Sequence, residues 1–476
     1  IILCAGVSVE AARKTVLAPS YAWRLMPPLG LREPASIDTL PDNYARRSVP
    51  SEVTDAWATT GNLGGAGLDM IWDSRPEVSD FFFRDAFSHW LPSYDKMRFY
   101  NTRIPMTLLS YNTGGGRDNA QDRLQGTFSG NINRQAQVGA MLDYLYSKGS
   151  YANQAAKDLA WGASGSYLGD RYEMQAFYYH YNLVSKENGG ITDPLYITDP
   201  ALIQGGVSSV NTKTIPTRLS NAHTRVSGQQ LYLNQRYKIG YWHEEYEGDS
   251  VVSRTYIPVT SVIWTFNYLG SKHNFHDDAS GEIKNFFENT YYDSKATIDR
   301  SGYWSVSNTV GLSLLEGFHR YAKFGLAGFL TYDVNHYNQP VYDDSESAGL
   351  TPLPEGFIPV PASHSEHNLS VGGQLTKQHG SILTYSATAR FGIAGRVAGD
   401  LDLEGRLATR FPLLGDTASI AARGSFTNTA TPYFLQQYRS NHFVWHNDFG
   451  KERRVNLGGS IDLRRTDTHI EAGISN

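Results

Sequence analysis

Long segments of alternating apolar and polar residues constrain this chain more than any other feature of its sequence. In residues 382–398, Tyr385 and Phe391 share one parity, and Thr384 and Arg390 share the other. Such alternation predicts a β-strand with one apolar face. Strands of soluble sandwiches run about 5–6 residues, whereas strands that cross a membrane need about 9–11, and these segments are of the longer kind. They lie near residues 97–112, 120–132, 135–148, 155–168, 171–183, 229–246, 251–270, 301–314, 319–334, 367–378, 382–398, 401–412, 417–428 and 452–464, and another begins near residue 467.

The connections between these segments alternate in length. Every second connection is brief, as at 133–134 and 169–170, and the long ones, such as 184–228, fall in the opposite phase. One exception is the tight turn at Gly399, which lies in the long phase. Outer-membrane barrels have short periplasmic turns and longer extracellular loops. The pattern predicts an all-β fold, a transmembrane antiparallel β-barrel of about 16 strands within a range of about 14 to 18.

Composition excludes several other classes of protein. The chain of 476 residues has one cysteine, Cys4, so it has no disulfide framework. No stretch reaches the roughly 18 consecutive apolar residues of a membrane-spanning helix. The charged fraction is 19%, below the roughly 25% of ordinary soluble domains. The net charge is -5 and we find no basic stripe, which excludes nucleic acid as an expected partner.

Aromatic residues gather near the ends of the predicted strands. Tyr144, Tyr178, Tyr179, Tyr181 and Trp264 are examples. Amphipathic rings favour the interface between membrane and water. We interpret these residues as interfacial girdles, and the alternative is a Tyr-rich soluble β-core.

The two ends of the chain are expected to differ from the barrel. Residues 1–7 are apolar and could be the tail of a signal peptide. Residues 1–96 do not alternate clearly and are interpreted as an N-terminal lead-in, either a plug or a periplasmic segment. Residues 97–476 are expected to form the barrel, truncated at the C-terminus.

Charged residues on the polar parity of three successive predicted strands are the candidates for a pore lining. Opposite charges on neighbouring strands lie within reach of cross-strand pairing, and such a wall selects solutes in a pore. In a closed barrel the same residues would fill the lumen with ion pairs. The candidates are Arg390, Arg396, Asp402, Glu404, Arg406, Arg410 and Arg423.

Four other motifs could carry chemistry, and each has a simpler interpretation. The HEEYE segment at 243–247 is similar to a zinc-binding HExxH motif, but its last position is Glu247 and the segment is predicted to be a strand. His364, near a second histidine, could hold a surface metal, and the segment 276–278 (HDD) could serve a hydrolase. The acidic run at 343–346 could bind calcium or sugars. A strand that runs into a turn explains the first motif and solvated loop residues explain the other three, so we expect no metal, no cofactor and no enzyme activity.

Several short segments occur in a characteristic order along the chain. They are YNTRIP at 100–105, LSY at 109–111, GSYANQ at 149–154, ENGGI at 187–191 and SNH at 440–442 with Trp445. In their order and spacing these segments resemble the Bacteroidetes-type family of putative porins, which are outer-membrane β-barrels. The resemblance spans most of the chain, from about residue 60 to about residue 460, and it implies no catalytic motif.

Together these observations predict an outer-membrane channel for passive diffusion of small hydrophilic solutes. The alternative is a closed structural barrel that acts as a subunit or docking scaffold in a larger outer-membrane complex, and an outer-membrane hydrolase is the weakest candidate. The expected partners are outer-membrane lipid and lipopolysaccharide, the solutes, and other outer-membrane proteins or lipoproteins.

Overall fold

A computed structural model of the chain describes most of its residues. The described residues are 20–35, 37, 56–72, 75, 77–92, 97–102, 104–247, 250–278, 286–319, 321–342, 350–378, 382–413, 416–466 and 468–476.

One antiparallel sheet of 15 strands dominates the structure, and its strands follow the order of the chain from β6 to β22. These strands coincide in order with the fourteen predicted segments and the one that begins near residue 467. They are β6 (Met106–Gly114), β7 (Gln121–Asn131), β8 (Ala136–Ser147), β9 (Ala155–Leu168), β10 (Tyr172–Lys186), β11 (His223–Glu247), β12 (Ser250–Asp277), β13 (Thr297–Leu314), β14 (Gly325–Asn338), β15 (Ser363–Lys377), β16 (Leu383–Ala394), β17 (Leu401–Leu413), β18 (Asp416–Ala430), β21 (Lys451–Leu463) and β22 (Thr468–Ser475).

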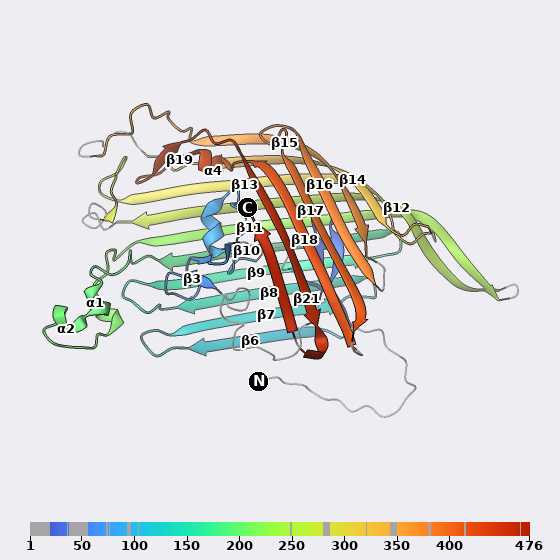
Figure 1. Cartoon of the computed structure of the whole chain (residues 1–476), viewed down its shortest axis with the longest axis horizontal. Coiled ribbons are helices and arrows are strands. Elements are labelled where there is room, and N and C mark those ends of the chain that lie inside the picture. Colours follow the sequence, from blue (N-terminus) through green and yellow to red (C-terminus); the bar gives the residue numbers. More distant parts are fainter. Residues whose placement is uncertain are drawn as a thin grey trace, which may run out of the picture.

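The sheet curves so that its C-terminal strands cross in front of the earlier ones (Figure 1). Its edge strands, β6 and β22, are not paired with each other in the described part of the chain, so the sheet is not closed. The long connections lie together at one end of the strands and the short turns at the other (Figure 1). The antiparallel all-β fold is therefore confirmed, whereas closure and a total of 16 strands stay predictions.

The alternation in the sequence corresponds to two different faces of the sheet. On β14, Leu330 is 47% exposed on the outer face, while its neighbour Phe329 is 4% exposed on the concave face. Leu312 on β13 and Leu403 on β17 are exposed in the same outward direction. An outer face of exposed apolar residues suits contact with lipid, and the concave face is polar or covered.

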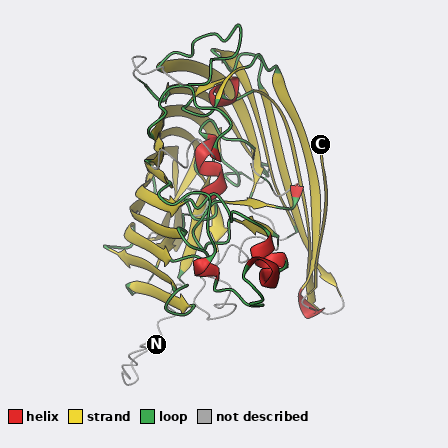
Figure 2. Ribbon diagram, turned by 90° about the vertical axis from the view of Figure 1, so that its left-hand side faces the viewer, coloured by secondary structure: helices red, strands yellow, loops and turns green. Residues whose placement is uncertain are grey.

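The concave face is covered by the N-terminal part of the chain. A small sheet combines β1 (Tyr21–Met26), β2 (Leu31–Ala35) and β5 (Phe99–Asn101), and a second pairs β3 (Trp57–Thr59) with β4 (Gly67–Asp69). The helix η4 (Phe82–Phe87) follows. Figure 2 shows short strands and helices between the two walls of the large sheet, and in Figure 1 the blue N-terminal elements lie inside the curve of that sheet. We call the described residues from 20 to 92 the interior segment.

β5 also changes the predicted start of the first long strand. Residues 97–112 were predicted to form one strand, but Phe99–Asn101 pairs with β1 instead, and β6 begins at Met106. Pro105 lies between the two strands. Proline has no backbone N–H to donate to a sheet, which favours a break there.

Buried aromatic residues join the interior segment to the wall of the sheet. Trp23 and Trp90 pack in one cluster with Phe177, Tyr179 and Tyr181 of β10. The prediction that Tyr179 and Tyr181 belong to an interfacial girdle is therefore wrong, because they are 3% and 1% exposed and point inward. The interior segment supplies an apolar surface on the side where a water-filled barrel would have none.

β11 and β12 extend well beyond their neighbours at the short-turn end (Figure 1). β10 stops pairing with β11 at Tyr237, and β13 stops pairing with β12 at Thr260. The two strands then continue as a two-stranded ribbon, which we call the projecting ribbon, Lys238–Glu247 with Ser250–Val259. The remaining short elements are α1 (Leu195–Thr198), α2 (Pro200–Ile203), η5 (Thr212–Thr214), α4 (Tyr433–Gln436), β19 (Gln437–Arg439), β20 (Val444–His446) and η6 (Arg464–Thr466).

Candidate functional site

Charged residues of β16, β17 and β18 share the concave face of the sheet. Arg390 lies opposite Asp402, and Arg406 lies opposite Arg423. Side chains two residues apart on a strand point to the same face, so Glu404 lies between Asp402 and Arg406 on that face. We call this group the charge ladder; it comprises Arg390, Asp402, Glu404, Arg406, Arg410, Arg423 and Glu471 of β22.

Three ion pairs hold the ladder together, two between strands and one, Arg406 with Glu404, within β17. Arg390 Nη2 lies 3.3 Å from Asp402 Oδ2, Arg406 Nη2 lies 2.8 Å from Glu404 Oε1, and Arg423 Nη2 lies 2.7 Å from Glu471 Oε1. Their side chains are 36% to 60% exposed. Exposed pairs contribute little stability, so the ladder is a hydrated charged wall rather than a packed core. Six of the seven predicted lining residues are gathered on it.

The orientation of the ladder follows from two contacts of the same face with the interior segment. Thr427, opposite Asp402, donates from Oγ1 to Glu77 Oε1 at 2.8 Å. Arg454, opposite Thr427, donates from Nη2 to the carbonyl oxygen of Arg75 at 2.8 Å. The ladder therefore faces the interior segment, and the opposite face carries the outward apolar residues.

The seventh predicted residue, Arg396, has a different place and a different set of partners. It lies in the connection between β16 and β17, beyond Ala394 where β16 ends. Its Nε donates to Glu366 Oε2 at 2.7 Å, and its Nη2 donates to Asp80 Oδ1 of the interior segment at 2.9 Å. Its Nη1 donates to the carbonyl oxygens of Ala430 and Thr431. Arg396 thus clamps the interior segment to β15 and to the end of β18.

The charge of Arg396 is secured by these partners. Burial by itself would lower the pKa of the guanidinium, but the carboxylates of Asp80 and Glu366 raise that pKa above its usual value. Glu366 is only 6% exposed. A buried carboxylate without its cationic partner is strongly unfavourable, so the clamp depends on both members.

The opposite wall holds the interior segment through further polar contacts. Ser147 Oγ of β8 donates to Asn62 Oδ1 at 2.5 Å, and Gln154 Nε2 donates to the carbonyl oxygen of Thr60 at 2.6 Å. Near the short-turn end, Arg32 Nη2 lies 2.9 Å from Glu173 Oε1. The interior segment therefore spans the concave face from one end of the strands to the other.

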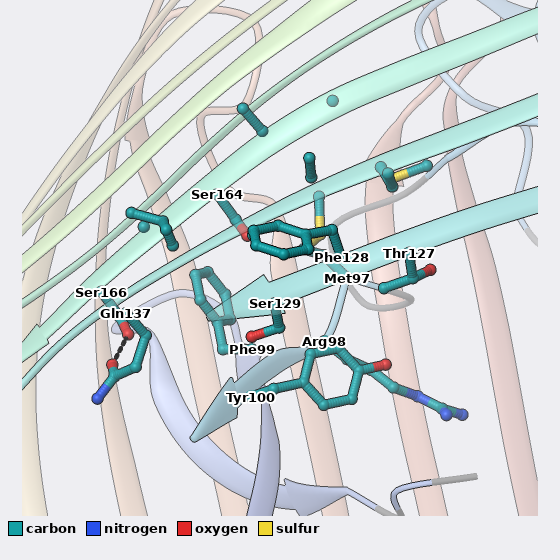
Figure 3. A pocket seen from close by; sticks show the side chains of 17 residues that line it. Met97, Arg98, Phe99, Tyr100, Thr127, Phe128, Ser129, Gln137, Ser164 and Ser166 are labelled. Carbon is teal, nitrogen blue, oxygen red and sulfur yellow. Dashed lines mark hydrogen bonds between the residues drawn. The ribbon is translucent and has the colours of Figure 1, made fainter. Parts of the chain in front are cut away.

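The space beside β5 is too small for a solute. Figure 3 shows Phe99 and Tyr100 over the strands β7, β8 and β9, with Ser166 donating a hydrogen bond to Gln137. The cavity there measures about 30 Å³, enough for about one water molecule. A second hollow, about 540 Å³, is bordered mostly by residues of the outward parity, such as Leu326 and Leu403. It opens toward lipid and is not a solute route.

The four motifs with other candidate chemistry do not come together. His243 and Glu244 lie on the projecting ribbon. His364 stacks on Tyr433 at 4.5 Å and lies 3.5 Å from Glu366, which belongs to the Arg396 clamp. His276 packs on another histidine at the start of β11, 5.0 Å away. The acidic run at 343–346 lies outside the described residues.

Within the described part of the chain, no group of three or more His, Cys, Asp or Glu residues is placed to hold a metal ion. A helix of sufficient length and apolar character to cross a membrane is also absent from the described residues.

The long loops pack on one another through His442. Its Nδ1 donates to the carbonyl oxygen of Asn289 at 2.7 Å, its Nε2 accepts from the Thr297 hydroxyl at 2.6 Å, and its ring stacks on Phe287 at 3.7 Å. Both ring nitrogens have hydrogen-bond partners when the ring is neutral. Burial lowers the pKa of His442 to about 4.

This arrangement predicts that loop packing weakens at acidic pH. Between pH 6.5 and pH 4, His442 takes up a proton when the loop is undocked but stays neutral when the loop is docked. The stability of the docked loop is therefore full above about pH 6.5 and falls below it. At pH 5 we expect loop opening to increase on the order of tenfold. Hydrogen exchange of residues 431–450, corrected for intrinsic rates, measures this. His442→Gln should remove the pH dependence; a loop equally protected at pH 5 and pH 7.5 contradicts it.

The sequence did not reveal the partners of the ladder and of Arg396 in the interior segment. Glu77 and Asp80 lie where no alternation or motif marks them. Their role depends on the interior segment returning to touch β18 and Arg396, residues more than 300 positions later. The absence of alternation in residues 1–96 was the only signal. It indicated a separate segment but not which residues that segment contacts.

Comparison with known proteins gives a family and a set of distant structures. The model of a family described as "Putative porin" matches residues 20–476. No protein with a curated description matches the sequence.

The siderophore receptor PirA from Acinetobacter baumannii is similar with a TM-score of 0.46 at 7% identity, over 78% of this chain and 57% of that chain. A mutant ferric enterobactin receptor from Pseudomonas aeruginosa has a TM-score of 0.45 at 10% identity, over 78% and 52%. The ferric citrate transporter FecA has a TM-score of 0.42 at 11% identity, over 80% and 61%. The chain thus spans little more than half the length of these structures.

Proposed function

The chain belongs to the porin family whose model covers residues 20–476, and from that premise we propose that it carries small hydrophilic solutes across the outer membrane by passive diffusion. Porins are transport proteins of the bacterial outer membrane, which places this chain there. Its assignment to the Bacteroidetes stays a prediction. The long loops are proposed to face the exterior, and the short turns and the projecting ribbon the periplasm.

The observation that carries the proposal is the hydrated charge ladder. Its arginines and carboxylates remain exposed on the concave face, whereas the concave face of β8 to β11 is sealed by the aromatic cluster. Charged, hydrated walls select solutes in a pore. We assign the solute path to the strip along β16, β17, β18, β21 and β22, between the exposed charge ladder and the interior segment, which acts as a plug over the rest of the concave face.

One observation favours the second candidate function, a closed barrel that acts as a scaffold. The interior segment contacts both walls and spans the concave face. If it fills the lumen completely, the protein has no path for solutes, and its long loops would dock partner proteins.

Solute uptake by proteoliposomes distinguishes the two functions. Purified protein is inserted in liposomes, and swelling is measured in sugars of increasing size against liposomes without protein. The proposal expects uptake that falls with solute size and is independent of any energy source. Uptake no faster than in bare liposomes, from protein shown to be folded and inserted, supports the scaffold instead.

A further inference from the structure

The projecting ribbon is an ordered structure that the transport function does not use. It extends by ten residues of β11 beyond the last pair with β10, which is roughly 30 Å at about 3.3 Å per residue. A two-stranded ribbon alone is marginally stable in water. The side-chain contacts that stabilise this ribbon, and the backbone groups at its open edge, are therefore informative.

One face of the ribbon is fixed by stacked side chains. The Trp242 and Tyr256 rings lie 5.1 Å apart, and the Arg254 guanidinium lies over the Trp242 ring at 4.6 Å. Arg254 Nε also lies 3.2 Å from Glu244 Oε1. At the base a β-bulge follows Ile239.

The outer edge of β11 is open along the ribbon. The last bond on this edge joins the Lys238 N–H to the carbonyl oxygen of Arg171. Strand residues present their backbone groups to alternate sides, so residues 240, 242, 244 and 246 direct N–H and C=O outward. In the described part of the chain no strand lies beside them. An open edge of this kind is a template for another strand.

The charge of the ribbon indicates which kind of strand can pair with its open edge. Residues 238–259 hold four acidic residues, Glu244, Glu245, Glu247 and Asp249, against Lys238 and Arg254. Pairing with a second copy would place acidic residues near one another, and like charges opposed across a ladder are destabilising. A basic strand has no such penalty.

We propose that the projecting ribbon is a docking site on which an extended, basic peptide segment of a periplasmic protein adds as a strand along the edge of β11. Backbone hydrogen bonds to residues 240–246 supply the binding, and Glu244 and Glu245 supply the preference for a basic strand. The periplasmic location rests on the proposed orientation of the barrel, while the binding itself does not.

The test uses the full protein in nanodiscs and a fluorescent Lys-Val-Lys-Val-Lys-Val peptide, with Glu-Val-Glu-Val-Glu-Val as its acidic counterpart. Fluorescence anisotropy is expected to show binding of the basic peptide that weakens with salt, and hydrogen exchange to show new protection in residues 240–246. Equal binding of the acidic peptide, protection elsewhere, or no binding overturns the proposal. Dimerisation through the ribbon without peptide overturns it in favour of a second copy.

Two matched substitutions at one position separate the edge from the side chain. Glu244→Pro removes an outward N–H, whereas Glu244→Ala keeps it, and both remove the pair with Arg254. Binding by Glu244→Pro should be at least about tenfold weaker than by Glu244→Ala, a difference of about 1.4 kcal/mol. Equal binding by the two variants overturns edge pairing.

Glu244→Pro could separate the two strands of the ribbon, and faster hydrogen exchange in residues 250–259 would reveal this. A third variant tests the proposal in that case. Glu244→Lys with Glu245→Lys should transfer the preference to the acidic peptide, and an unchanged preference overturns the charge argument. Solute uptake by proteoliposomes that carry these variants should equal that of the wild type. Failure of peptide binding and failure of transport are thus separate results.

Discussion

Inverting two arginines of the charge ladder, Arg406→Glu with Arg410→Glu, is expected to convert a weak preference for anions into a preference for cations. The ladder has four arginines against three carboxylates, so the double substitution makes its net charge negative. A unit charge at about 4 Å in water contributes about 1 kcal/mol. The change should shift the ratio of cation to anion permeability on the order of tenfold.

The reversal potential in a salt gradient across a planar bilayer measures this ratio. The charge-matched control is Arg134→Glu with Arg254→Glu, because Arg134 lies in the turn between β7 and β8 and Arg254 lies on the projecting ribbon. The control should leave the reversal potential close to that of the wild type. Equal shifts for both double variants would mean that the ladder does not line the path.

Releasing the clamp between Asp80 and Arg396 is expected to increase the current by displacing the interior segment. Asp80→Asn removes the charge that Arg396 Nη2 meets at 2.9 Å, and Arg396→Ala also leaves the buried Glu366 without its partner. Loss of one member of a buried pair costs about 3–5 kcal/mol, and partial exposure of Asp80 and Arg396 reduces this figure. Even about 1.4 kcal/mol raises the displaced population tenfold.

Open probability in single-channel recordings measures this displacement. Asp85→Asn is the control, because Asp85 accepts hydrogen bonds from Ser79 within the interior segment, and none of the described residues of the wall donates to it. Combining Asp80→Asn with Arg396→Ala should add less than the sum of the single effects, since both act through one pair. If Asp85→Asn opens the channel as much as Asp80→Asn does, the clamp is not the controlling contact.

The large sheet could be predicted from the sequence because each of its faces meets a different environment. Leu330 and Leu403 are exposed outward, and their strand neighbours point inward, so alternation of period two records the fold directly. Six residues of the charge ladder could be predicted in the same way, because they share the polar parity of their strands. Arg396 could be named but not placed, because it lies beyond the end of β16 and meets partners far away in the sequence.

The interior segment is where sequence reasoning was least informative. Its contacts join Trp23 and Trp90 to the inward side of β10, and no local pattern specifies such distant packing. This also explains why Tyr179 and Tyr181 were wrongly assigned to a girdle. An inward aromatic residue looks out of place in a water-filled barrel, and it is favourable once an apolar segment covers it.

The measurement that tests the central claim most directly is the single-channel conductance of the purified wild-type protein in a planar lipid bilayer. The account predicts discrete current steps, present without an energy source, that arise from a path along the charge ladder. Silence from protein that is demonstrably folded and inserted would contradict it and would leave the closed scaffold as the function of this barrel.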